Sequence, residues 1–205
     1  MKILFVLLKA PVSLENSGMY PDLIKQFADN GHEVTVIGGS TEPTRIYSEC
    51  GVKIISVKSL PVLYVKNLIF KGIAMATLPW YFKSAYKKFL NNEVFDWIVM
   101  PTPPITLIDV VKYIKKKSGA KLYTILRDIH PQSSASLGEI KYKWMERYLY
   151  RRSDIGYRVS DIIGCMSPEN INFIKREHNI PNSTKCRILY NWMNYVPYHD
   201  EESGD

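Results

Sequence analysis

The sequence predicts a doubly wound α/β fold, in which helices cover both faces of a mostly parallel sheet of about seven strands. Short apolar runs of strand length alternate with stretches whose apolar residues recur every three or four positions. Most of the short runs are apolar on both faces, as strands inside a parallel sheet are. Apolar residues make up 46% of the 205 residues, enough for one large core. A single Rossmann-like domain is therefore expected.

The expected strands are short and β-favouring, and turn-forming or polar residues follow most of them. They comprise residues 2–8, 33–37, 52–57, 95–100, 121–126, 162–166 and 187–190. Residues 40–51 are polar and are expected to be irregular. The turn after the first strand lacks the glycine-rich dinucleotide fingerprint, because only Gly18 is present and it lies well after the strand.

Helices are expected over residues 18–30, 105–117, 142–159 and 168–178. Gly31 ends the first of them, and the cations Lys115–Lys117 suit the negative end of the second. Gly156 is a point at which the third helix could be interrupted. Ser167 and Pro168 form a typical helix start, since serine caps the free amides and proline fits the first turn.

Residues 62–90 are apolar and aromatic, with lysines scattered among them. Because proline removes a backbone donor and clashes with the preceding turn, two helices broken near Pro79 are expected. A basic amphipathic stretch of this kind can lie on an anionic membrane. It can equally be a crossover helix with its lysines in water, and the need to cover the sheet favours this second role for most of the stretch.

The formal net charge of +7 suits an anionic partner, namely nucleic acid, an anionic membrane or a phosphorylated substrate, although a basic surface also keeps a protein in solution. The interleaved aromatic and basic residues at 141–158 fit a core face beside a solvated helix face, so no nucleic acid is expected. The three cysteines are widely spaced and suit a reducing cytosol. No His/Cys cluster has zinc spacing, and neither metal nor cofactor is expected.

Three polar turns follow the first, fourth and fifth expected strands, at residues 9–18, 101–104 and 127–136. In the usual doubly wound order these strands adjoin the switch point, where ligands bind outside the carboxyl ends of the strands. The turns would then frame one cleft for a polar ligand, and Gly18 would let the backbone approach it at the start of the first helix. Asp128 could instead cap a helix, and His130 could pack on the surface.

Taken together, these segments resemble the N-terminal half of a retaining glycosyltransferase of the two-Rossmann (GT-B) type, in the large group four family. The resemblance covers nearly all of residues 1–194 and rests on the order of its motifs. These are KILFVLL at 2–8, Ser17-Gly18, GHEVTVIGG at 31–39, Pro103-Pro104, Asp128 to Ser133 with Leu137-Gly138, Tyr150 to Asp154, Asp161 to Ile163, Ser167-Pro168 and Asn191-Trp192. The Asp-x-x-Pro turn and the Asn-Trp end are most similar to bacterial transferases that build surface polysaccharides.

Three segments depart from the family pattern. Ser17 precedes Gly18 where the family usually has paired glycines, and Arg127 stands where many members have histidine. His130-Pro131-Gln132 replaces the Trp-Pro-Glu of similar proteins. The family's C-terminal domain, which holds the nucleotide-sugar, has no counterpart in these 205 residues.

The resemblance implies an acceptor-binding half of a hexosyltransferase for capsular, O-antigen or exopolysaccharide synthesis, inactive without a donor domain. Residues 1–194 would form the acceptor domain, and the acidic residues 195–205 would be a tail or the start of a linker. Asp128 is the expected catalytic residue. The expected acceptor-binding residues are Ser17, Gly18, Pro103, Arg127 and His130.

The expected acceptor is a sugar linked to polyprenyl diphosphate, and the nucleotide-sugar would be bound only with a second domain or chain. The protein is expected to be cytoplasmic, and peripheral on the inner face of the cell membrane if residues 62–90 bind it. Two rival functions stay open: a non-enzymatic Rossmann-like binding or partner module, and a nucleotide-binding enzyme of the flavodoxin sort.

Overall fold

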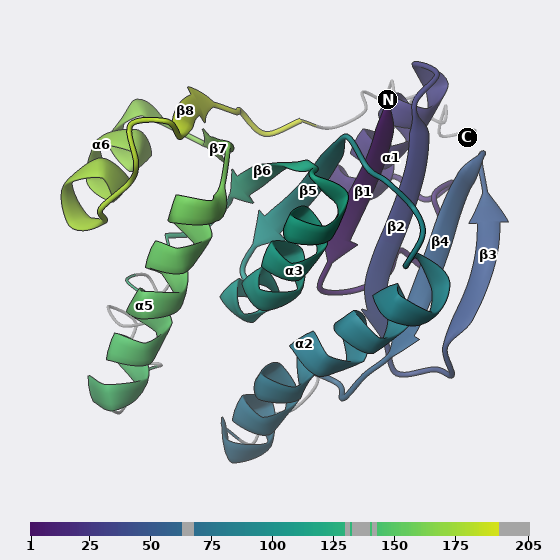
Figure 1. The fold of residues 1–205 in the computed structure, drawn as a ribbon, viewed down its shortest axis with the longest axis horizontal. Helices are drawn as coiled ribbons and strands as arrows, with labels where there is room; N and C mark the ends of the chain where they lie inside the picture. Colours follow the sequence, from purple (N-terminus) through teal and green to yellow (C-terminus); the bar gives the residue numbers. More distant parts are fainter. Residues whose placement is uncertain (63–67, 130–131, 133–139, 141–142, 193–205) are drawn as a thin grey trace, which may run out of the picture.

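The computed structural model describes residues 1–62, 68–129, 132, 140 and 143–192. These residues form a doubly wound α/β domain around one eight-stranded sheet, so the predicted fold class is confirmed (Figure 1). The strand order is β3-β4-β2-β1-β5-β6-β7-β8, and every neighbouring pair is parallel except β3 and β4. The strands are β1 (Lys2–Leu7), β2 (Glu33–Ser40), β3 (Arg45–Glu49), β4 (Val52–Lys58), β5 (Trp97–Thr102), β6 (Lys121–Leu126), β7 (Ile162–Cys165) and β8 (Lys185–Ile188).

Helices pack on both faces of the sheet, as the apolar character of the strands requires. They are α1 (Met19–Asp29), α2 (Leu68–Phe89), the 3₁₀ turn η1 (Ile105–Leu107), α3 (Ile108–Ser118), α5 (Lys143–Val159) and α6 (Pro168–Glu177). Alternate residues of β1 enter two different cores: Leu4 packs with α2 and α3, whereas Phe5 packs with α1. No helix among the described residues is both long enough and apolar enough to cross a membrane.

The prediction of two helices broken near Pro79 was wrong, since α2 runs unbroken from Leu68 to Phe89 with Pro79 inside it. The reason is burial on both sides of the proline. Leu78, Phe82 and Tyr86 are each almost fully buried against the sheet. Tertiary packing of these side chains outweighs a proline's cost of about 3 kcal/mol in a helix interior.

The prediction that residues 40–51 are irregular was also wrong, because Arg45–Glu49 forms the edge strand β3, antiparallel to β4. Its side chains are mostly exposed, so its sequence has no apolar pattern that predicts a strand. The signal is in the turn: Cys50 has φ of 50° and Gly51 has φ of 73°. Two successive positive φ angles are the conformation of a tight hairpin.

The interruption that Gly156 could have caused does not occur, since α5 is continuous, and this glycine lies against Ile105, whose Cδ1 atom would be 3.2 Å from an added Cβ. The predicted helix start at residue 168 agrees with the structure. The Ser167 side chain accepts a hydrogen bond from the amide of Asn170, which is the predicted cap of α6.

The loop after β1 folds tightly across the end of β2. The amide of Ala10 donates to the carbonyl of Gly39 at 2.9 Å. A Cβ on Gly38 would lie 2.5 Å from both Cα and N of Ala10, and a Cβ on Gly39 would lie 2.5 Å from the carbonyl oxygen of Leu8. Both glycines are therefore required by the close approach of two backbones.

The substitution Gly38→Ala is expected to lower the free energy of unfolding by about 2 kcal/mol, because the new methyl group meets backbone that has little room to move. The urea midpoint of the purified chain measures this. Gly72→Ala is the matched control: no described residue lies within 4 Å of its added Cβ, and alanine favours a helix by up to about 1 kcal/mol. A Gly38→Ala protein as stable as the unsubstituted chain would contradict the expectation.

Candidate functional site

The candidate site lies where the strand order reverses. β1 pairs in parallel with β2 on one side and with β5 on the other, and β6 follows β5. The turns after β1, β5 and β6 therefore leave the same carboxyl edge of the sheet, next to one another. Open α/β sheets bind ligands at this point.

The first helix begins without a side-chain cap. Gly18 is its N-cap residue, and its carbonyl accepts from the amide of Asp22 at 2.8 Å, but glycine has no side chain with which to cap the free amides of the first turn. Uncapped amides and the helix dipole give this end a partial positive charge. Ser17, just before it, is exposed.

Glycine at position 18 is not demanded by the fold itself. Its φ of 170° is ordinary extended backbone, and an added Cβ would meet only Pro21 Cδ, at 3.5 Å. This situation differs from that of Gly38 and Gly39. A requirement for glycine at this position would come from a ligand.

Arg127 reaches from the turn after β6 to the start of α1. Its guanidinium contacts the sulfur of Met19 and lies beside the Tyr20 hydroxyl. Burial raises the pKa of Tyr20, and the charge of Arg127 partly offsets that rise. The Arg127 Nε atom is buried and has no hydrogen-bond partner among the described residues. Its cationic group therefore adds to the positive end of the helix.

Trp192 closes the other side of this helix start. Its indole Nε1 donates to the carbonyl of Met19 at 2.6 Å, and its ring lies edge-on to Tyr20 with the centroids 6.5 Å apart. From the sequence, Trp192 was only part of a motif near the end of the domain. Its contact with Met19 joins positions 173 residues apart, and no local pattern predicts such a pair.

The structure brings Gly18, Arg127 and Asp128 to one place. Asp128 is exposed, and its charge acts on Tyr20. Pro103 is also exposed and leaves the same edge at the end of β5, where the Thr102–Pro103 and Pro103–Pro104 peptides are both cis. His130 lies outside the described residues.

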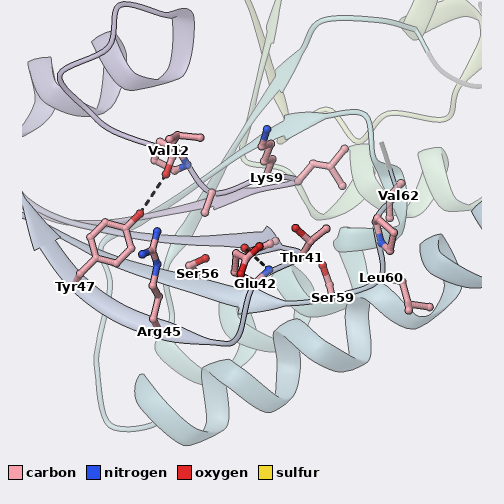
Figure 2. A pocket seen from close by; sticks show the side chains of 16 residues that line it. Lys9, Val12, Thr41, Glu42, Arg45, Tyr47, Ser56, Ser59, Leu60 and Val62 are labelled. Atoms are coloured by element: carbon pink, nitrogen blue, oxygen red, sulfur yellow. Dashed lines mark hydrogen bonds between the residues drawn. The ribbon is translucent and has the colours of Figure 1, made fainter. Parts of the chain in front are cut away.

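A hollow of about 270 Å³ lies at the ends of β1, β2 and β4, where the loop after β1 and both apolar and polar side chains line it (Figure 2). Hydroxyl groups and charges of both signs line it, namely those of Lys9, Ser40, Thr41, Glu42, Arg45, Tyr47, Ser56 and Ser59. The guanidinium of Arg45 lies over the ring of Tyr47, 4.9 Å from its centroid. Hydroxyls beside charged groups suit a ligand that carries many hydroxyl groups, such as a sugar.

The unexpected strand β3 builds one wall of the hollow and also holds the loop after β1. The Tyr47 hydroxyl donates to the carbonyl of Pro11 at 3.2 Å. The Glu49 carboxylate accepts from the Ser13 hydroxyl and, at 2.9 Å, from the amide of Leu14. The Ser13 bond is the main reason why the pKa of Glu49 is lowered. Tyr47 and Glu49 were not predicted as site residues, because the polar sequence of residues 40–51 has no strand pattern.

No cluster of three or more His, Cys, Asp or Glu side chains with metal-binding geometry occurs in the described parts of the chain.

Comparison with known proteins finds likeness at the level of structure. No family model and no curated protein matches the sequence. A sucrose-phosphate synthase from Thermosynechococcus elongatus superposes with a TM-score of 0.61 at 10% identity, covering 93% of this chain and 88% of that one. The glycotransferase of kitacinnamycin superposes with a TM-score of 0.53 at 14% identity, covering all of this chain and 54% of that one. The chain thus shares its α/β fold with proteins named as sugar-handling enzymes, and it spans about half of the second.

Proposed function

We propose that this chain is the acceptor-binding lobe of a glycosyltransferase. The proposal rests on the convergence of the α1 start, Arg127 and Asp128 at the switch point. The loop after β1, which leaves the same edge of the sheet, lines a hollow that also carries hydroxyl groups. The shared fold with the two sugar-handling enzymes supports the same function. Asp128 would accept a hydrogen bond from the hydroxyl group that attacks the donor sugar.

The charges of the site support an acceptor that carries phosphate. The uncapped amides of α1 and the guanidinium of Arg127 both favour a phosphate group. A sugar linked to polyprenyl diphosphate combines such a group with hydroxyls for the hollow. Ser17, Pro103 and His130 would complete the acceptor site.

The second half of the reaction would lie in another segment or chain. The kitacinnamycin glycotransferase is about twice as long as the part this chain matches. We assign nucleotide-sugar binding and stabilisation of the leaving diphosphate to that other half. The complete enzyme would be a hexosyltransferase of capsular, O-antigen or exopolysaccharide synthesis.

A membrane-facing surface along α2 and at the start of α5 would bring a lipid-linked acceptor to the site. Phe70, Ile73 and Trp80 of α2 are 62%, 47% and 68% exposed and share one helix face by their spacing. Trp144 and Tyr148 of α5 are also exposed. Both helices begin at the carboxyl edge of the sheet, at the lower left of Figure 1. Basic side chains on α2 and α5 suit anionic lipid, and with them the protein would bind the inner face of the cell membrane.

The ligand proposal predicts that farnesyl diphosphate binds the chain and that Gly18→Ala and Arg127→Gln each weaken binding at least about tenfold. Alanine would block close approach, and glutamine would remove a charge-assisted hydrogen bond. Isothermal titration calorimetry measures the affinities, with Lys121→Gln as the control that removes an exposed cation at the opposite edge of the sheet, where β6 begins. Equal affinity of Gly18→Ala and unsubstituted protein, or stronger binding of a flavin, would contradict the proposal.

The catalytic proposal predicts that this chain alone does not consume a nucleotide-sugar, and that the chain joined to a donor half does. Asp128→Ala should then lower kcat at least about 100-fold, the usual size of a lost acid–base contribution. Asp29→Ala, an exposed carboxylate at the far end of α1, is the control. Turnover by the lone chain, or full activity of Asp128→Ala, would exclude this mechanism.

The membrane proposal predicts salt-dependent binding to phosphatidylglycerol vesicles, and about tenfold weaker partitioning of a Phe70→Ser/Trp80→Ser variant, because two apolar contacts are lost. Vesicle sedimentation measures this. Val94→Ser is the matched control, since Val94 is 65% exposed but lies just before β5 at the opposite edge of the sheet. If the unsubstituted chain remains in the supernatant at low salt, the surface does not bind membranes.

A further inference from the structure

His178 is an almost completely buried histidine whose backbone is held from both sides. It caps the C-terminus of α6, its amide donates to the carbonyl of Ile174 at 3.0 Å, and its own carbonyl accepts from Ile180 at 2.9 Å. Only 3% of the residue is exposed. Histidine is seldom so buried without hydrogen-bond partners for its ring nitrogens.

Two tyrosines of α5 hold the imidazole ring in one orientation. Tyr150 stacks on it with the centroids 5.5 Å apart and the planes 24° apart. Tyr157 meets it edge-on at 4.8 Å. The ring is therefore clamped before any of its hydrogen bonds is considered.

The hydrogen bonds of His178 set its tautomer. Nδ1 lies 2.7 Å from a carboxylate oxygen of Asp154, which can only accept, so Nδ1 carries a proton. Nε2 lies 2.9 Å from the side-chain nitrogen of Gln132, which can only donate, so Nε2 offers its lone pair. By holding the proton on Nδ1, Asp154 leaves Nε2 free to accept a hydrogen bond from Gln132.

Gln132 belongs to the turn after β6, four residues beyond Asp128. A hydrogen bond from Gln132 also reaches the Tyr150 hydroxyl and partly offsets the rise that burial causes in the pKa of Tyr150. Its side-chain amide therefore donates to two acceptors, while its Oε1 atom is buried without a partner among the described residues. Ile129, next to Asp128, packs into the small core that contains Tyr157 and Ile174.

We infer that His178 is a positioning residue that fastens the turn after β6 and thereby fixes Asp128 at the candidate site. The hydrogen bonds that His178 makes with Asp154 and with Gln132 are the polar contacts that hold the turn, and the packing of Ile129 is the apolar contact. Asp128 stands exposed just before Ile129 and close to the start of α1. The importance of this arrangement for sugar transfer rests on the function proposed above, whereas the fastening of the turn does not.

Two substitutions separate this role from simple core packing, because both remove the ring. The side-chain amide of His178→Gln reaches the former Nε2 position and can accept from Gln132. That of His178→Asn reaches the Nδ1 position and can donate to Asp154 but not meet Gln132. A packing role predicts equal effects, and a positioning role predicts that glutamine rescues the turn.

Trypsin cleavage after Arg127, followed by mass spectrometry under native conditions, reports opening of the turn. We expect His178→Asn and Gln132→Met each to raise this rate about tenfold, and the double variant to raise it no further, since both remove one hydrogen bond. His178→Gln should stay within about twofold of unsubstituted protein. Cleavage after the exposed Arg45 of β3 is the internal control for global unfolding.

Equal cleavage in His178→Gln and His178→Asn, or no change in Gln132→Met, would overturn the inference. Farnesyl diphosphate binding, measured on the same proteins, is a separate readout. If the cleavage rates divide as expected while the unsubstituted chain binds no diphosphate, the fastening of the turn stands and the proposed function fails. If both hold, His178→Asn should also raise the KM for acceptor of the complete enzyme more than it lowers kcat.

Discussion

The parallel pairing of β1 with both β2 and β5 is the constraint on which the rest of this structure depends. Because β1 has partners on both sides, the chain extends the sheet first toward β4 and then, after the crossover through α2, toward β8. The turns that leave β1, β5 and β6 consequently diverge from neighbouring positions. Every group of the candidate site comes from one of these turns or from a segment that packs against them.

The loop after β1 is shaped by two kinds of contact. Gly38 and Gly39 let its backbone lie directly on β2, so side chains are excluded where the loop turns. Farther along, the loop is hydrogen-bonded to Tyr47 and Glu49 of the edge strand. The exposed edge strand β3 thus holds the loop that follows β1, a strand at the centre of the sheet. Edge strands need a reason not to pair with other chains, and the short, charged β3 meets that need as well.

The turn after β6 is held at both ends, and Asp128 lies between the two attachments. Arg127 reaches toward α1 on one side, and Ile129 and Gln132 reach toward α5 and α6 on the other. Asp128 is thus exposed, while the residues before and after it are held by contacts with the helices on either side. A site that must orient a hydroxyl group benefits from this rigidity, since catalysis depends on alignment of the reacting groups.

The sequence by itself determined the fold class, the parallel strands, most helix limits and the cap at Ser167, because hydrophobic periodicity and helix-end chemistry are local properties. It also indicated which turns share the edge where the structure places Gly18, Pro103 and Asp128. Only the tertiary structure decided the unbroken α2, the strand β3, the direction of Arg127, the partners of His178 and the hollow beside β3. The physical reason is that each depends on packing or hydrogen bonds between distant residues: burial of Leu78 and Phe82 overrides Pro79, and Gln132 meets a histidine 46 positions away.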